Sequence, residues 1–147
     1  MARHQSVSLV VPKQPHNTVL TDMLASLGGF IECETEDTMN TMMVVCNLMG
    51  GLYGTLRNYR DWLVRHGVSP QQASYYVGRQ YWGMMQDAVY ECENPSRFDD
   101  LVEEQTPGGL NEQVLGNLEK LGVFDAYDTA MDAVLSRIEG KSDGSLL

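Results

Sequence analysis

Two short β-strand patterns lie within the first 35 residues, and no further strand pattern follows them. The run SVSLVV from Ser6 to Val11 is β-branched and apolar, which is typical of a buried strand. The run FIECE from Phe30 to Glu34 gives a second strand, and residues 17–27 between the two have a helical pattern with Asn17 as a candidate N-cap. This order predicts a βαβ unit with parallel strands. Because two parallel strands alone do not make a stable sheet, we interpret residues 1–35 as the remnant of a larger one.

Residues 36–65 have the pattern of one long helix. The segment MNTMMVVCNLMGGLYGTL within it is apolar on nearly every side, which predicts a helix that is buried all round. Gly50 and Gly54 are four residues apart, so they lie on one face where a second helix backbone could approach closely. A domain this small can hardly bury such a helix within itself. We therefore expect a homodimer.

The rest of the chain is also predicted to be helical. Ser69, Pro70 and Gln72 have the pattern of a capping box, and the helix that they begin should end before Asn94. Further helices are expected at residues 98–104, 110–121 and 124–138, followed by a disordered tail at residues 140–147. The predicted fold class is mainly α, a helical bundle with a small N-terminal βαβ remnant.

Composition excludes several classes of function. The chain of 147 residues has a formal net charge of −10 and only 10 Lys and Arg residues, which opposes binding to nucleic acid. Cys33, Cys46 and Cys92 have neither zinc-ligand nor disulfide-framework spacing, so we expect no metal site and a reducing cytoplasm. The apolar stretch at residues 42–56 is too short to span a membrane, and the N-terminal residues lack the pattern of a signal peptide. We expect a cytoplasmic protein without a membrane partner.

The sequence TPGG at residues 106–109 precedes the helix expected at residues 110–121. Pro107 fixes one backbone dihedral, and Gly108 and Gly109 place no side chains between the backbone amides and a neighbour. Exposed amides at a helix N-terminus favour a carboxylate or a phosphate. The alternative is a tight corner between two helices. A larger residue at Gly109 is expected to block a ligand and to leave the helix intact.

The run TPGGLNEQVLGNLEKLGVFDAYDTAMDAVLSR resembles the C-terminal dimerisation domain of the pyrroline-5-carboxylate reductase family. The run LVRHGVSPQQASYYVGRQYWGMM is similar to the family's second helix, and LMGGLYGTL stands where the family has a Ser- and Gly-rich start of its long helix. The run LVVPKQP fits the last strand of the family's nucleotide-binding domain. The resemblance covers residues 6–137.

This resemblance implies a two-domain NAD(P)H-dependent oxidoreductase of proline biosynthesis, whose helical domain forms an intertwined homodimer. It divides the chain into a remnant of the nucleotide-binding domain at 1–35, a helical dimerisation and substrate domain at 36–139, and a tail at 140–147. The printed sequence contains no G-x-G-x-x-G motif, so we expect no cofactor site and no catalytic residue in this chain, and no activity for the chain alone. NAD(P)H is implied only for a full-length relative.

In the family the PGG turn receives the carboxylate of the imino acid. Carried over to this sequence, the substrate-binding positions are Thr106, Gly108, Gly109 and Asn111. Leu110 and Asn111 replace the hydroxyl residues that usually follow PGG, which puts the usual substrate in doubt. The alternative function is a non-enzymatic homodimerisation module that stands alone.

Three other residue groups have simple structural explanations. The aromatic group, expected in the core or at a subunit interface, consists of Tyr75, Tyr76, Tyr81 and Trp82. The basic group, expected on a solvated face with an ion pair between Arg57 and Asp61, consists of Arg57, Arg60, Arg65 and His66. The alternative for this group is attraction of the phosphate of a cofactor held by a partner domain. The acidic run, expected at a strand end and a helix N-terminus, consists of Glu32, Glu34, Glu36 and Asp37.

Overall fold

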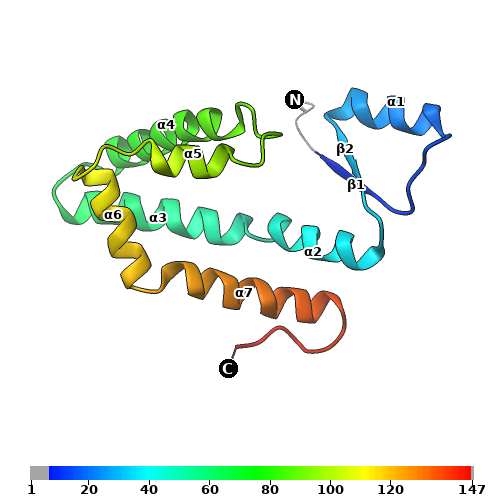
Figure 1. Cartoon of the computed structure of the whole chain (residues 1–147). Helices are drawn as coiled ribbons and strands as arrows, with labels where there is room; N and C mark the ends of the chain where they lie inside the picture. The colour runs from blue at the N-terminus through cyan, green and yellow to red at the C-terminus, as the bar shows by residue number, and fades with distance from the viewer. Residues whose placement is uncertain (1–6, 147) are drawn as a thin grey trace. The chain divides into compact units, whose positions relative to one another are not determined.

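The structure is a computed structural model that describes residues 7–146. Two strands and seven helices follow one another in the described residues in the order β1-α1-β2-α2-α3-α4-α5-α6-α7 (Figure 1). The chain divides into two compact units, one formed by Met1–Leu48 and Tyr127–Leu147 and the other by Met49–Ala126. The predicted fold class, mainly α with a small βαβ element, is confirmed.

The first unit contains the βαβ element. Strand β1 (Ser8–Val10) pairs in parallel with β2 (Phe30–Glu32), and helix α1 (Thr18–Leu27) connects them. Asn17 caps α1, because its side-chain oxygen accepts a hydrogen bond from the N–H of Leu20 at 3.2 Å. The crossover and its cap are as the sequence predicts, although both strands are shorter. Ser6, where the first strand was expected to begin, lies outside the described residues.

The helix predicted as one element over residues 36–65 is two helices. α2 (Glu36–Cys46) ends where the side-chain amide of Asn47 donates to the carbonyl oxygen of Met43 at 2.9 Å. α3 (Met49–Arg65) begins three residues after α2 ends. The prediction of a single helix was wrong because an asparagine amide competes with the helix for backbone carbonyls. The two glycines that follow, Gly50 and Gly51, also propagate a helix poorly.

Few side chains are fully buried within the single chain. The buried apolar residues of the described part are Cys33 and Val44 in the first unit and Ala73 and Val77 in the second. Within the single chain, the segment predicted as a helix buried all round exposes large apolar groups, with Val45 of α2 63% exposed and Met49 of α3 59% exposed. In the first unit, the Sγ of Cys33 lies 4.0 Å from the Sδ of Met42 on α2.

In the second unit, α3 and α4 (Pro70–Val89) pack side by side as a helical hairpin (Figure 1). The turn between them is closed by two backbone hydrogen bonds, from Gly67 to Val64 and from Val68 to Leu63, both at 3.1 Å. This is the bonding pattern of a Schellman motif, and the φ of +90° at Gly67 is the conformation that the motif requires.

The N-cap at Ser69 that the sequence predicts for α4 is confirmed, and the Gln72 side chain reaches back to the Ser69 hydroxyl and not to its backbone. The Ser69 hydroxyl accepts from the N–H of Gln72 at 3.3 Å and donates to the Gln72 side chain at 2.7 Å. The ring of Tyr81 on α4 stacks on Tyr59 of α3 with a centroid distance of 5.5 Å. The hairpin is therefore fixed at its turn and along its length.

The last three helices complete the described chain. They are α5 (Arg97–Glu103), α6 (Leu110–Lys120) and α7 (Val123–Ile138), each within one or two residues of the predicted bounds. A second Schellman pattern ends α7, where the N–H of Lys141 donates to the carbonyl oxygen of Ser136 at 2.8 Å. Residues 139–146 contain no helix or strand.

Candidate functional site

The turn of Thr106, Pro107, Gly108 and Gly109 connects α5 to α6 and is held by its own backbone. The N–H of Gly109 donates to the carbonyl oxygen of Thr106 at 2.8 Å. Gly108 has a φ of +72°, in the left-handed region that glycine adopts without steric cost. Gly109 is extended and occupies the N-cap position of α6, where it offers no side-chain acceptor. The turn therefore needs an acceptor from elsewhere.

Glu112 supplies that acceptor from the first turn of α6. Its Oε2 accepts a hydrogen bond from the backbone N–H of Gly108 at 2.6 Å. The carboxylate also lies at the end of the helix where the dipole favours negative charge. We expected the amides of Gly108 and Gly109 to be available to a ligand. Both instead donate to acceptors within the chain.

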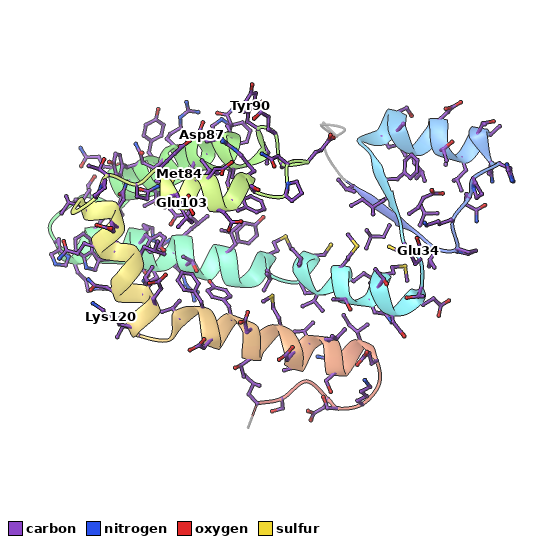
Figure 2. All side chains as sticks on the ribbon, viewed as in Figure 1. Glu34, Met84, Asp87, Tyr90, Glu103 and Lys120 are labelled. Atoms are coloured by element: carbon purple, nitrogen blue, oxygen red, sulfur yellow. The ribbon has the colours of Figure 1, made fainter. Side chains whose placement is uncertain are left out.

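Only two of the four predicted substrate-binding residues line the hollow beside this turn. Gly108 and Gly109 line a shallow hollow of about 370 Å³ along α6, whereas Thr106 and Asn111 are exposed and do not line it. The residues that line the hollow with the glycines are Glu112, Gln113, Gly116, Asn117 and Lys120. Figure 2 labels Lys120 on α6.

Our sequence reasoning missed Glu112. The available signal was its position, because an acidic residue at the third position of a helix can reach back to an uncapped amide.

Gly109 has a second, purely structural role. A Cβ at this position would lie 2.7 Å from the carbonyl oxygen of Thr106 and 3.3 Å from the Thr106 Cβ. The first distance is shorter than any ordinary contact, so a side chain here would open the turn. A larger residue at Gly109 would therefore disturb the turn before α6 and not only block the approach of a ligand.

Two further hollows lie between α3 and α4. The larger, of about 290 Å³, is mainly apolar, and its lining residues are Tyr59, Trp62, Leu63, Tyr76, Val77, Gln80, Tyr81 and Met84. Two members of the predicted aromatic group, Tyr76 and Tyr81, thus meet Tyr59 and Trp62 from the other helix. Tyr75, by contrast, is 72% exposed and lines no hollow described here.

The second hollow, of about 270 Å³, contains two members of the basic group. Its lining residues are Tyr53, Leu56, Arg57, Arg60, Ser74, Val77 and Gly78. The prediction of an ion pair between Arg57 and Asp61 was wrong. Asp61 instead accepts from its neighbour Arg60, with Nε at 2.8 Å and Nη2 at 2.7 Å from Oδ1. The adjacent Arg60 therefore takes the carboxylate that the helical spacing assigned to Arg57.

The acidic run is accounted for by local contacts. Glu36 and Asp37 lie in the first turn of α2, as expected. Glu32 accepts from the N–H of Gln14 at 2.6 Å, and Glu34, labelled in Figure 2, pairs with Lys13. The hydrogen bond and charge of Glu34 raise the pKa of Lys13 above its ordinary value. No group of metal-ligating side chains occurs within residues 7–146.

None of the helices in the described part of the chain combines the length and apolarity needed to cross a membrane.

Comparisons with known proteins give matches in three-dimensional structure but none in sequence. No protein-family model matches the chain, and no curated protein matches it by sequence. The structure is similar to the crystal structure of 1-pyrroline-5-carboxylate reductase from Streptococcus pyogenes, with a TM-score of 0.70, 18% identity and coverage of 93% of this chain. It is also similar to pyrroline carboxylate reductase from Plasmodium falciparum, solved with NADP bound, with a TM-score of 0.69, 17% identity and 97% coverage.

In both cases the chain covers 54% of the solved protein. The likeness at this identity concerns the three-dimensional arrangement of the chain. The protein therefore has the fold of about half of a pyrroline-5-carboxylate reductase, as the sequence resemblance predicts.

Proposed function

We propose that this chain is the C-terminal dimerisation and substrate-pocket region of a pyrroline-5-carboxylate reductase-like oxidoreductase. The observation that carries the proposal is the shared fold, which extends over 93% and 97% of the chain in the two comparisons. A likeness over nearly the whole chain favours a common architecture rather than a local motif. The reductase activity and the NAD(P)H cofactor belong to this proposal.

The exposed apolar side chains of α3 support dimerisation. Met49, Leu52 and Tyr53 lie on one side of this helix and are each more than two-fifths exposed. A second copy of the chain is the partner that would bury such a face with the fewest assumptions.

The substrate pocket is proposed at the turn before α6. A small imino-acid carboxylate would bind the first amides of α6, at Leu110 and Asn111, together with the Thr106 hydroxyl. It would have to displace Glu112 to reach the amide of Gly108. Because the ligand competes with an internal carboxylate, we expect affinity in the millimolar range.

The described residues do not fit the pyrophosphate of a dinucleotide. A Rossmann crossover would hold it with a glycine-rich turn after the first strand and with the open N-terminus of the following helix. Here the residues after β1 are V-P-K-Q-P-H-N, and Asn17 caps α1 with its own side chain. We therefore propose no hydride-transfer step through residues of this chain. Any cofactor would be held by residues outside it.

A homodimerisation module without enzymatic activity is the second candidate. It is favoured by one observation, the engagement of the Gly108 and Gly109 amides within the chain. Two measurements on the purified chain separate the candidates. Light scattering gives the oligomeric state, and amide chemical shifts during titration with L-proline report ligand binding at residues 106–111. A dimer whose amides respond to proline supports the reductase-like region, and a dimer with unchanged shifts supports the module.

A further inference from the structure

The hollow between α3 and α4 around Arg57 combines positive charge, hydroxyl groups and an apolar floor. α3 contributes Tyr53, Leu56, Arg57 and Arg60, and α4 contributes Ser74, Val77 and Gly78. Both helices belong to the second unit and pack side by side (Figure 1). The hollow is therefore defined by one helical hairpin and needs no other part of the chain.

The charge of the hollow is only partly balanced. Arg57 and Arg60 are three residues apart, so their side chains share a face of α3 and repel each other. Arg60 pairs with Asp61, whereas Arg57 has no ion pair with any residue in the range 7–146. The protein has a formal net charge of −10, so an unbalanced guanidinium here opposes the sign of the whole molecule. Arg57 thus gives the hollow a local attraction for anions.

The opposite wall leaves room for a ligand. Val77 is buried and forms part of the floor, while Ser74 and Gly78 are one helical turn apart on α4. A Cβ built at Gly78 would meet no atom within 4 Å, so the space above this residue is open. The Ser74 hydroxyl provides a donor that can complete the shell of an oxyanion.

We propose that this hollow binds the oxyanion group of a small organic molecule, a phosphate monoester or a carboxylate with a compact apolar body. Arg57 would hold the oxyanion by paired N–H donors, which match the geometry of carboxylate and phosphate oxygens, while Arg60 stays paired with Asp61. Leu56 and Val77 would contact the apolar body. This site is distinct from the turn before α6 and does not depend on the proposed reductase-like function.

The test uses the full chain and inorganic phosphate as the probe. Backbone amide shifts are followed during titration with phosphate, against sodium chloride at matched ionic strength. We expect saturable shifts at residues 53–60 and 74–78 with a millimolar Kd, and no comparable change with chloride. Arg57→Gln should weaken binding at least tenfold. Arg65→Gln removes the same charge from α3 outside the hollow and should change the Kd less than twofold.

A second pair of variants tests the space instead of the charge. Gly78→Ala adds a methyl group where nothing lies within 4 Å and should retain phosphate binding. Gly78→Leu extends a larger side chain into the hollow and should abolish it. Equal weakening of phosphate binding by Arg57→Gln and Arg65→Gln would show that only the overall charge matters, and would overturn the site. A wild-type titration without saturable shifts would also overturn it. Light scattering on the same samples tests dimerisation separately, so each idea can fail alone.

Discussion

The carboxylate of Glu112 binds the backbone N–H of Gly108 at 2.6 Å, and this contact closes the turn that precedes α6. The carboxylate occupies the place that a ligand carboxylate would take at the same amide. Glu112 is therefore both a cap for the helix and a competitor for any anion. Its removal should separate these two effects.

Replacing Glu112 with alanine should destabilise the chain and improve anion binding at the turn. The free energy of unfolding should fall by about 1 kcal/mol, the usual effect of losing a helix cap. In an amide-shift titration, L-proline should bind the variant several-fold more tightly than the wild type, because its carboxylate no longer competes with an internal one. Urea denaturation measures the first effect.

Glu119→Ala is the matched control, since Glu119 is exposed, carries the same charge and lies in the last turn of α6. It should leave proline binding unchanged. If the amides of residues 106–111 give no response to proline in the Glu112 variant while the dimer stays intact, the turn is only a structural corner.

Gly109→Val should disturb the turn itself. Its Cβ would lie 2.7 Å from the Thr106 carbonyl oxygen, so the backbone has to move and the Gly109 to Thr106 hydrogen bond is strained. We expect a loss of about 1–3 kcal/mol in the free energy of unfolding, the range found for overpacked sites. Thermal or urea denaturation provides the measurement.

Gly116→Ala should raise the free energy of unfolding, whereas Gly109→Val should lower it. Gly116 is in the interior of α6, and a Cβ there would meet no atom within 4 Å. The variant should gain about 0.5–1 kcal/mol from helix propensity. Equal stability of the Gly109→Val variant and the wild type would show that the turn is not held as described.

The chain should be a dimer at micromolar concentration, and leucine at Gly50 or Gly54 should weaken it. Within one chain, a Cβ at either glycine meets no atom within 4 Å, so a larger residue is tolerated by the monomer. A loss of association would therefore report contact with a partner backbone. We expect at least a tenfold increase in the dimer dissociation constant, about 1.4 kcal/mol.

Light scattering over a dilution series measures this association, with Gly54→Ala as the conservative control. Circular dichroism would confirm that the leucine variants keep their helices. A monodisperse wild-type monomer would contradict the proposed dimer.

The chain alone should bind neither NADH nor NADPH and should not oxidise NADPH in the presence of 1-pyrroline-5-carboxylate. The physical reason is the lack of a backbone cradle for the pyrophosphate after β1, where Asn17 already caps the following helix. Calorimetric titration tests the binding. Saturable heats at micromolar concentrations of either dinucleotide would place a cofactor site in this chain and refute the prediction.

Local signals determined most of the secondary structure. The Asn17 and Ser69 caps each act through hydrogen bonds within a few residues, so their effect can be read from the sequence. The parallel pairing of β1 and β2 follows from the crossover through α1. The prediction of one helix over residues 36–65 failed because hydrophobic periodicity does not show that the Asn47 side chain competes for a backbone carbonyl.

Tertiary structure decided which side chains meet and which groups remain available. The sequence pointed to the amides of Gly108 and Gly109, but only the fold of the turn shows that Thr106 and Glu112 already accept from them. Likewise, helical spacing paired Arg57 with Asp61, whereas the folded chain gives that carboxylate to Arg60 and leaves Arg57 at the hollow beside Ser74 and Gly78. The physical reason is the same in both cases. Sequence patterns fix the backbone and the face of each element, but competition among nearby donors for one acceptor depends on distances of a few tenths of an ångström that only the packed structure sets.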